Sequence, residues 1–302
     1  MNGLDSVALN FSPSSLVVLN IILGLVMYGI ALGIRTDDFR RVLRVRRALI
    51  IGLSGQFIVL PAVTFVLIQL VRPEPSIALG MILVAACPGG NISNFFTQHA
   101  LGNAALSVSM SAVSTAAAIV MTPLNLAFWG GLDHETAAIL RAVDIDPLFI
   151  VFVITLIMGV PLVLGMATAR YWPAVAARMR DPFRLLSMMF FVLFVLGALV
   201  ANFQNFLDHV GAVALIVLTH NGLAIASGYW LARVSGMPEY DRRAVAIEVG
   251  IQNSGLGLVL IFNFFDGLGG MAIITAWWGI WHIVSGMTLA TLWRRYAPAV
   301  AG

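Results

Sequence analysis

The sequence has 302 residues, of which 60% are hydrophobic and only 10% are charged, and its mean hydropathy is +0.95. This composition excludes a soluble globular protein and indicates a chain with several membrane spans. The single cysteine, Cys87, excludes an intrachain disulfide and a multi-cysteine metal cluster. Residues 1–13 contain no Lys or Arg, so we expect the first apolar stretch to be a span and not a cleaved signal peptide.

Nine apolar stretches follow one another along the chain, and most have the ~20 residues needed to cross a hydrocarbon core. The predicted spans are Ser15–Gly33, Ala48–Val71, Ser76–Ala100, Ala104–Phe128, Pro147–Arg170, Phe183–Phe203, Val210–Ala232, Ala244–Phe265 and Met271–Trp293. We therefore predict an all-α polytopic membrane protein with nine transmembrane helices.

The arginines give the expected orientation of these spans. The chain has seventeen basic residues, all arginine, and fifteen fall on one side if the N-terminus lies outside. Only Arg72 and Arg141 fall on the other side. Because basic loops stay in the cytoplasm, we predict a multi-pass protein of the inner (plasma) membrane with its C-terminus inside. This bias also explains the pI near 9.5 without nucleic acid as a partner.

The third and eighth predicted spans are interrupted by glycine, proline and amide residues, at 87–94 and 250–255. The two interruptions lie five spans apart, so their segments cross the membrane in opposite senses. The second span carries Gln56, and the seventh, its counterpart, carries His220 and Asn221 at similar depth. Interrupted spans in corresponding places of inverted halves are typical of secondary transporters. The alternative is that Gly and Pro are simply common in membrane helices.

Glu248 is the only acidic residue inside a long apolar stretch. A carboxylate in hydrocarbon is costly, and irregular backbone at this depth needs protein or a water-filled cavity around it. Carbonyl, amide and hydroxyl oxygens near this charge favour a Na⁺ or substrate site. The alternative is a packed helix with Glu248 near the interface. Ser107 and Ser111 share a helix face, a spacing that by itself favours helix packing by small residues.

The sequence resembles the bile acid/sodium symporter family over nearly its whole length. The motifs that carry the resemblance are Cys87-Pro88-Gly89-Gly90 with Ser93-Asn94, Ala105-Leu106-Ser107-Val108, Glu248-Val249-Gly250-Ile251-Gln252-Asn253-Ser254-Gly255, and Trp281-His282. The resemblance implies inverted repeats with two discontinuous crossing helices. It also implies a core domain (46–130 and 209–296) and a panel domain (12–34 and 145–203).

The same resemblance implies symport of two Na⁺ ions with an organic anion by alternating access. The first sodium site would consist of Ser93, Asn94, Ser107, Ser111 and Glu248. The second would consist of Gln56, Gln252, Glu248 and the carbonyls of Val249 and Ile251. The substrate would lie near Asn91, Asn253 and His282, and would be bile acid-like or a small carboxylate such as pantoate. Three departures bear on this: Asn91 and Ser111 stand where relatives commonly have Thr, and Ile283 stands where some bile-acid-binding relatives have Asn.

Two alternatives to sodium symport stay open at this stage. One is a proton-coupled or uncoupled anion carrier, in which Glu248 titrates. The other is an intramembrane enzyme using Glu248 with a histidine, which the lack of an HExxH motif and of a nucleophile elbow disfavours. We expect no enzyme activity and no obligate protein partner. Asp133-His134-Glu135 is expected in a polar loop, and His220 is expected as a hydrogen-bonded core residue more than as a proton relay.

Overall fold

The computed structural model describes residues 13–33, 46–90, 92–143, 147–201 and 203–296. The regular structure in these ranges is helical apart from one isolated β-bridge, which confirms the all-α prediction. Five helical stretches are long and apolar enough to cross a membrane: Arg46–Val71, Ala104–Leu132, Val151–Tyr171, Val213–Val234 and Gly269–Arg294. Three shorter apolar helices are Val17–Gly29, Pro75–Ala86 and Ser254–Phe264. The number of nine spans stays a prediction.

The stretch that carries Gln56 contains a π-helical turn. Helix α3 (Arg46–Ser54) continues through η2 (Gly55–Val59) into α4 (Leu60–Val71). Pro61 has no N–H, and its ring would clash with the carbonyl four residues earlier, so the preceding turn widens. The N–H of Leu60 consequently donates to the carbonyl of Gly55. Such turns are frequent at functional sites, and this one contains Gln56.

A second π-helical turn has the same relation to a proline. Helix α9 (Pro147–Ile154) continues through η3 (Thr155–Gly159) into α10 (Val160–Tyr171), with Pro161 at its start. The N–H of Val160 donates to the carbonyl of Thr155. Both widened turns therefore follow from the sequence through one missing N–H group.

Both predicted interruptions are confirmed. The first separates α5 (Pro75–Ala86) from α6 (Ile92–His99), and the second separates α13 (Glu239–Gly250) from α14 (Ser254–Phe264). Gly89 and Gln252 form an antiparallel β-bridge between them. The N–H of Gly90 donates to the carbonyl of Ile251 at 2.7 Å, and the N–H of Asn253 to that of Pro88 at 2.8 Å. Each interruption thus satisfies backbone groups that the other leaves without a helical partner.

Several helices extend beyond the predicted spans. The polar loop expected at residues 133–135 is wrong, because α8 (His134–Val143) begins there and follows α7 (Ala104–Leu132). The side chain of Asp133 accepts the N–H groups of Glu135 and Thr136 and so caps α8. Helices α11 (Pro173–Ala201) and α12 (Phe203–Val234) also begin before the predicted spans. The spans were predicted from the length of each apolar stretch. A helix can continue past the end of that stretch into polar residues, so the apolar length underestimates the helix.

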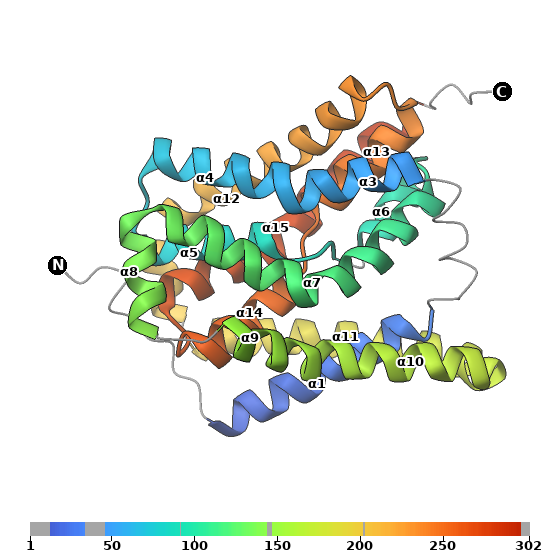
Figure 1. Cartoon of the computed structure of the whole chain (residues 1–302), viewed down its shortest axis with the longest axis horizontal. Helices are drawn as coiled ribbons and strands as arrows, with labels where there is room; N and C mark the ends of the chain where they lie inside the picture. The colour runs from blue at the N-terminus through green and yellow to red at the C-terminus, as the bar shows by residue number, and fades with distance from the viewer. Residues whose placement is uncertain (1–12, 34–45, 91, 144–146, 202, 297–302) are drawn as a thin grey trace.

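The helices lie in two layers in Figure 1. One, along the lower edge, contains α1 (Pro13–Ala31), which packs against α10 and α11, together with α9. The other contains both interruptions. In it α13 packs on α12, and α5 packs between α7 and α15 (Gly269–Arg294). Every residue of α5 after Pro75 is buried, so the first interruption begins deep inside the protein.

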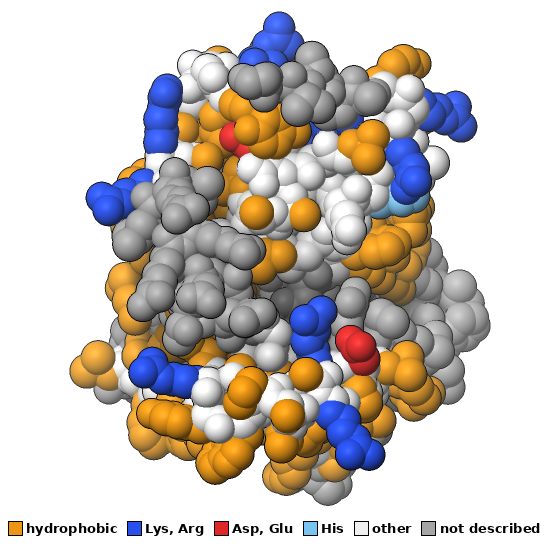
Figure 2. All heavy atoms as spheres, turned by 90° about the vertical axis from the view of Figure 1, so that its right-hand side faces the viewer, with side chains coloured by type: hydrophobic (Ala, Val, Ile, Leu, Met, Phe, Trp, Pro, Cys, Tyr) orange, Lys and Arg blue, Asp and Glu red, His pale blue; other side chains and the backbone are white. Residues whose placement is uncertain are grey.

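One end of the molecule is rich in basic side chains. Figure 2 shows the end to the right of Figure 1, where basic side chains are spread over the surface and acidic ones are far fewer. Described arginines on this side of the predicted spans include Arg46, Arg170, Arg233 and Arg294. This basic end agrees with the predicted cytoplasmic side, and the orientation in the membrane stays a prediction.

Candidate functional site

Glu248 receives three hydroxyl donors from two other helices. Its carboxylate is fully buried. Ser93 at the start of α6 and Ser107 on α7 each place Oγ 2.5 Å from Oε1 of Glu248. Ser111, one turn after Ser107, lies 3.1 Å from both carboxylate oxygens. The serine pair on α7 therefore faces the carboxylate, which favours a role at the site for its spacing.

Asn94 completes this cluster. Its Oδ1 lies 2.8 Å from the hydroxyl of Ser107 and 3.4 Å from that of Ser111. The five residues expected at the first sodium site are thus brought together. A serine hydroxyl has one hydrogen, yet the hydroxyl of Ser107 faces acceptor oxygens of both Asn94 and Glu248. A group of oxygens that outnumbers its donor hydrogens fits a hard cation, which binds carboxylate, amide and hydroxyl oxygens.

Gln56 approaches the backbone of Gly89, as Glu248 does. Its side chain is fully buried, and neither amide atom has a hydrogen-bond partner among the described residues. A Cβ atom built on Gly89 would lie 2.8 Å from Oε2 of Glu248 and 3.1 Å from Nε2 of Gln56. Both side chains therefore converge on the backbone of Gly89, where only glycine leaves them room. A buried amide without protein partners leaves both its atoms available to a bound ion or an ordered water.

The second interruption contributes another unpaired oxygen. Gln252 is fully buried and donates its Nε2 to the carbonyl of Val249 at 2.8 Å. Its Oε1 is buried without a hydrogen-bond partner in the described structure. The carbonyl of Ile251 already accepts the N–H of Gly90, but a carbonyl oxygen has two lone pairs. The residues expected at the second site therefore fit a cation.

The residues expected near the substrate are not joined by any contact that the structure gives. Asn253 is half-buried, and its Oδ1 accepts the N–H of Leu256, which caps α14. His282 lies on α15 with 6% of its surface exposed and with Nδ1 unpaired among the described residues. Asn91 lies outside the described residues. Their role at the substrate stays a prediction.

His220 is a hydrogen-bonded core residue, as expected. Its Nε2 lies 2.7 Å from Oγ1 of Thr64, and its ring packs edge-on against Trp278 with centroids 4.6 Å apart. The hydroxyl of Thr64 also lies 2.8 Å from the carbonyl of Leu60. Since that carbonyl can only accept, the single hydroxyl hydrogen points to it, and His220 donates from Nε2.

The burial of Arg243 and the partner of Asn221 were not predicted from the sequence. Arg243 is only 4% exposed. Its guanidinium donates to the carbonyls of Ala100, Trp293 and Tyr296, at the ends of α6 and α15. It stabilises these helix ends and has no contact with Glu248 in the described structure. Asn221 donates to the carbonyl of Gly250 at 2.7 Å; nothing in its place among apolar residues indicates that partner.

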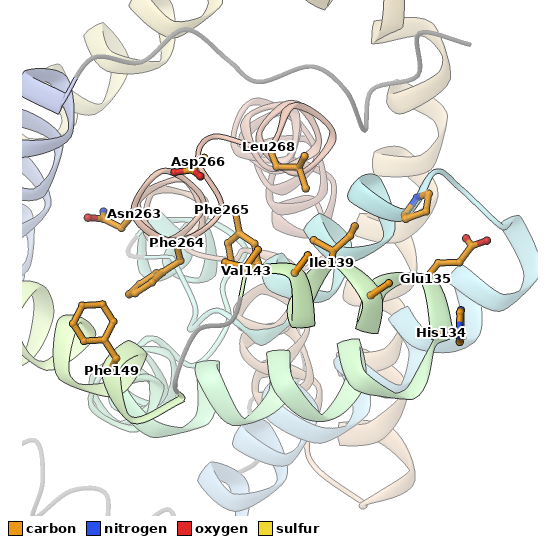
Figure 3. Close-up of a pocket in the computed structure, with 13 residues that line it drawn as sticks. His134, Glu135, Ile139, Val143, Phe149, Asn263, Phe264, Phe265, Asp266 and Leu268 are labelled. Carbon is orange, nitrogen blue, oxygen red and sulfur yellow. The ribbon is translucent and has the colours of Figure 1, made fainter.

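A separate cavity of about 1200 Å³ lies at the opposite end of the molecule from the face in Figure 2. Figure 3 shows it between α8, the end of α14 and the start of α15, with Phe149 of α9 on one side. Its titratable lining residues are His134, Glu135 and Asp266. None of the residues predicted for the ion or substrate sites lines this cavity, so we place the candidate site at Glu248 and not there.

The comparison with known proteins agrees with this geometry. A profile described as the Sodium Bile acid symporter family matches residues 20–209, which include the first interruption and the serines of α7. The chain belongs to the sodium bile acid symporter family. The profile match ends before Glu248. Similarity in the region of the second interruption therefore has to be judged from the individual relatives.

Three relatives show how far the similarity extends. The uncharacterized sodium-dependent transporter YocS of Bacillus subtilis is 33% identical over 92% of this chain and 83% of its own length. The probable chloroplastic sodium/metabolite cotransporter BASS2 of Oryza sativa subsp. japonica is 30% identical over 92% of this chain, which spans 64% of the plant protein. The ileal sodium/bile acid cotransporter of Cricetulus griseus is 29% identical over 79% of this chain and 67% of its own length.

Proposed function

We propose that this member of the family is a secondary transporter that carries an organic anion together with Na⁺. The observation that supports it most directly is the convergence of Ser93, Ser107 and Ser111 on the buried carboxylate of Glu248. A single buried negative charge, surrounded by neutral oxygens and lying beside two helix interruptions, suits a small hard cation. The relatives named as sodium-dependent transporters support the same coupling ion.

We propose two Na⁺ ions on opposite sides of Glu248. The first would be held by the hydroxyl and amide oxygens of α6 and α7. The second would be held by Gln56, Gln252 and the carbonyls of Val249 and Ile251. The fully buried amide of Gln56, without a partner among the described residues, supports the second site independently of the first.

The substrate is proposed to be an anion of modest size, a small carboxylate such as pantoate or a bile acid-like molecule. It would lie at the crossing of the two interruptions, near Asn91, Asn253 and His282. The N-termini of α6 and α14 supply positive half-helix dipoles there, each of which contributes roughly 0.3–2 kcal/mol. Since such groups bind an anion weakly, a nearby Na⁺ is expected to raise its affinity, and by linkage the anion raises that of Na⁺ equally.

We propose that transport proceeds by alternating access between two domains in the plasma membrane. The core domain (46–130 and 209–296) would carry the ions and the anion, and the panel domain (12–34 and 145–203) would support it. The separation of α1, α9, α10 and α11 from the layer with the interruptions favours this division. The spread of arginines over one end supports a cytoplasmic C-terminus.

Proteoliposome uptake and calorimetry would test this function. Radiolabelled carboxylates should accumulate under an inward Na⁺ gradient, and calorimetry should give a higher anion affinity in Na⁺ than in K⁺. Equal affinity in both salts would contradict sodium coupling. Uptake driven by a proton gradient alone would favour the proton-coupled alternative. A cation or neutral solute that binds better than every carboxylate would contradict the anion class.

A further inference from the structure

The end of α13 leaves three successive carbonyls at the interruption, those of Val249, Gly250 and Ile251. A buried helix terminus needs hydrogen-bond donors for such groups. Val249 receives the side chain of Gln252, and Ile251 receives the N–H of Gly90. The middle carbonyl, that of Gly250, accepts a hydrogen bond from a different helix: Nδ2 of Asn221 on α12 lies 2.7 Å away.

The amide of Asn221 is held at both ends. The side chain is fully buried, and its Oδ1 lies 2.6 Å from the hydroxyl of Ser285 on α15. Because a carbonyl can only accept, Nδ2 must face Gly250, which leaves Oδ1 to accept from Ser285. Asn221 therefore has one orientation, and it connects the last turn of α13 to both α12 and α15.

The packing around this contact is also close. A Cβ atom built on Gly250 would overlap Cγ1 of Ile225, one turn after Asn221 on α12. A Cβ built on Gly228 would lie 2.9 Å from Cβ of Val249. At Gly228 and Gly250, α12 and the end of α13 thus approach each other so closely that neither position has room for a side chain. The last turn of α13 cannot tilt without breaking these contacts.

From these contacts we infer that Asn221 is a positioning residue for the cation bound at the second interruption. By holding the carbonyl of Gly250, it fixes the Gly250–Ile251 peptide plane. The peptides on either side of this plane carry the carbonyls of Val249 and Ile251, the two proposed ligands, so their directions are restricted as well. It does not itself touch the ion. The inference rests on the proposed function, because it assigns a role toward the second proposed Na⁺.

Sodium titrations of the purified protein would test it, with the unfolding temperature measured as K⁺ is replaced by Na⁺ at constant ionic strength. Asn221→Ala should weaken the apparent Na⁺ affinity by about 10- to 100-fold, the usual effect of losing a group that orients a metal ligand. Asn221→Leu removes the donor without adding a charge, and should act in the same direction. Ser285→Ala leaves the bond to Gly250 in place, so its shift should be smaller.

Asn125 provides a matched control. It is a buried asparagine on α7 that donates to the carbonyl of Met121 in its own helix and accepts from Trp129. Asn125→Ala should lower the unfolding temperature but leave the Na⁺ affinity unchanged. Equal Na⁺ affinities in wild type and Asn221→Ala, or equal shifts in Asn125→Ala and Asn221→Ala, would overturn the inference.

Two further outcomes separate this inference from the proposed function. If the wild type were stabilised by Na⁺ no more than by K⁺, sodium coupling would fail and the inference with it. If the wild type responded to Na⁺ and Asn221→Ala responded equally, only the inference would fail. Should Asn221→Ala not fold, Asn221→Leu and Ser285→Ala still test the inference, because a role limited to packing predicts unchanged Na⁺ affinity in both.

Discussion

The hydroxyl of Ser107 lies 2.5 Å from Oε1 of Glu248, although the two residues are 141 positions apart in the chain. The contact joins α7 to the end of α13, and Asn94 of α6 approaches the same hydroxyl. Three helices therefore meet at one buried carboxylate. Because each helix contributes its own side chain, the role of each group at the proposed sodium site can be tested by a separate substitution.

Glu248→Gln should abolish the stabilisation of the protein by Na⁺, because a neutral amide offers the cation no charge. In the wild type, Na⁺ at 100 times its dissociation constant should add about 2.7 kcal/mol to the free energy of unfolding. Thermal unfolding in NaCl and in KCl measures this difference. Glu135→Gln, at an exposed position on α8, is the control and should respond like the wild type. A Glu248→Gln protein that kept the full sodium response would refute the role of the carboxylate.

Ser107→Ala and Ser109→Ala form a matched pair on α7. The hydroxyl of Ser107 bonds to Glu248, whereas that of Ser109 bonds to the carbonyl of Ala105 in its own helix. Ser107→Ala should lose a hydrogen bond to a charged group, worth about 1.5–3 kcal/mol of stability, and should weaken Na⁺ binding. Ser109→Ala should leave Na⁺ binding unchanged. Titrations of unfolding temperature against Na⁺ separate the two, and a shift of the same size in both variants would contradict the ligand role of Ser107.

The sequence predicted the interruptions because glycine, proline and amides disfavour a continuous helix wherever they cluster in an apolar stretch. It predicted the importance of Glu248 because an isolated charge in hydrocarbon needs partners. Other features have no such local cause. Nothing near Asn221 names Gly250 as its partner, since a single amide on an apolar helix can face any neighbour.

Helix ends were harder to predict than interruptions. Helix α8 was expected as a polar loop because His134 and Glu135 are polar, yet the cap supplied by Asp133 begins a helix there. The burial of Arg243 depends on carbonyls at the ends of two distant helices, which apolar periodicity does not report. Tertiary contacts decide such features.

Gln56→Leu should separate stability from sodium binding. Because neither amide atom of Gln56 has a partner among the described residues, its burial is costly without an ion, by about 1–3 kcal/mol for an unsatisfied polar group. A leucine of similar volume should raise the unfolding temperature in K⁺ and reduce its response to Na⁺. Differential scanning calorimetry in both salts would show this. A lower unfolding temperature in K⁺ would mean that the amide is satisfied without sodium.

Gly89→Ala should weaken sodium binding by steric crowding. The added Cβ would lie 2.8 Å from Oε2 of Glu248 and 3.1 Å from Nε2 of Gln56, so both side chains would have to move. Gly131→Ala on α7 is the control, because a Cβ there meets nothing within 4 Å. The control should raise stability by up to about 1 kcal/mol through helix propensity. Sodium titration of both variants gives the comparison, and unchanged Na⁺ affinity in Gly89→Ala would exclude a site beside this glycine.

Asn20 of α1 and Asn263 of α14 form a hydrogen-bonded contact between the two layers of helices. Each side-chain amide donates to the other, at 3.0 and 2.9 Å. If the layers move relative to each other during transport, this pair must separate. Cysteines at both positions, joined by a short reversible thiol cross-linker, should stop uptake into proteoliposomes but preserve the sodium response of the unfolding temperature.

The cross-linking test has two controls within the same protein. The native cysteine, Cys87, is fully buried, so wild type treated with the reagent should transport normally. Each single cysteine variant should do the same, and a reductant should restore transport in the cross-linked double variant. Because the ion ligands lie away from this contact, loss of both uptake and sodium binding would indicate distortion of the site. Full uptake by the cross-linked protein would show that α1 and α14 stay together throughout the transport cycle, and would contradict the proposed division into a moving core and a panel.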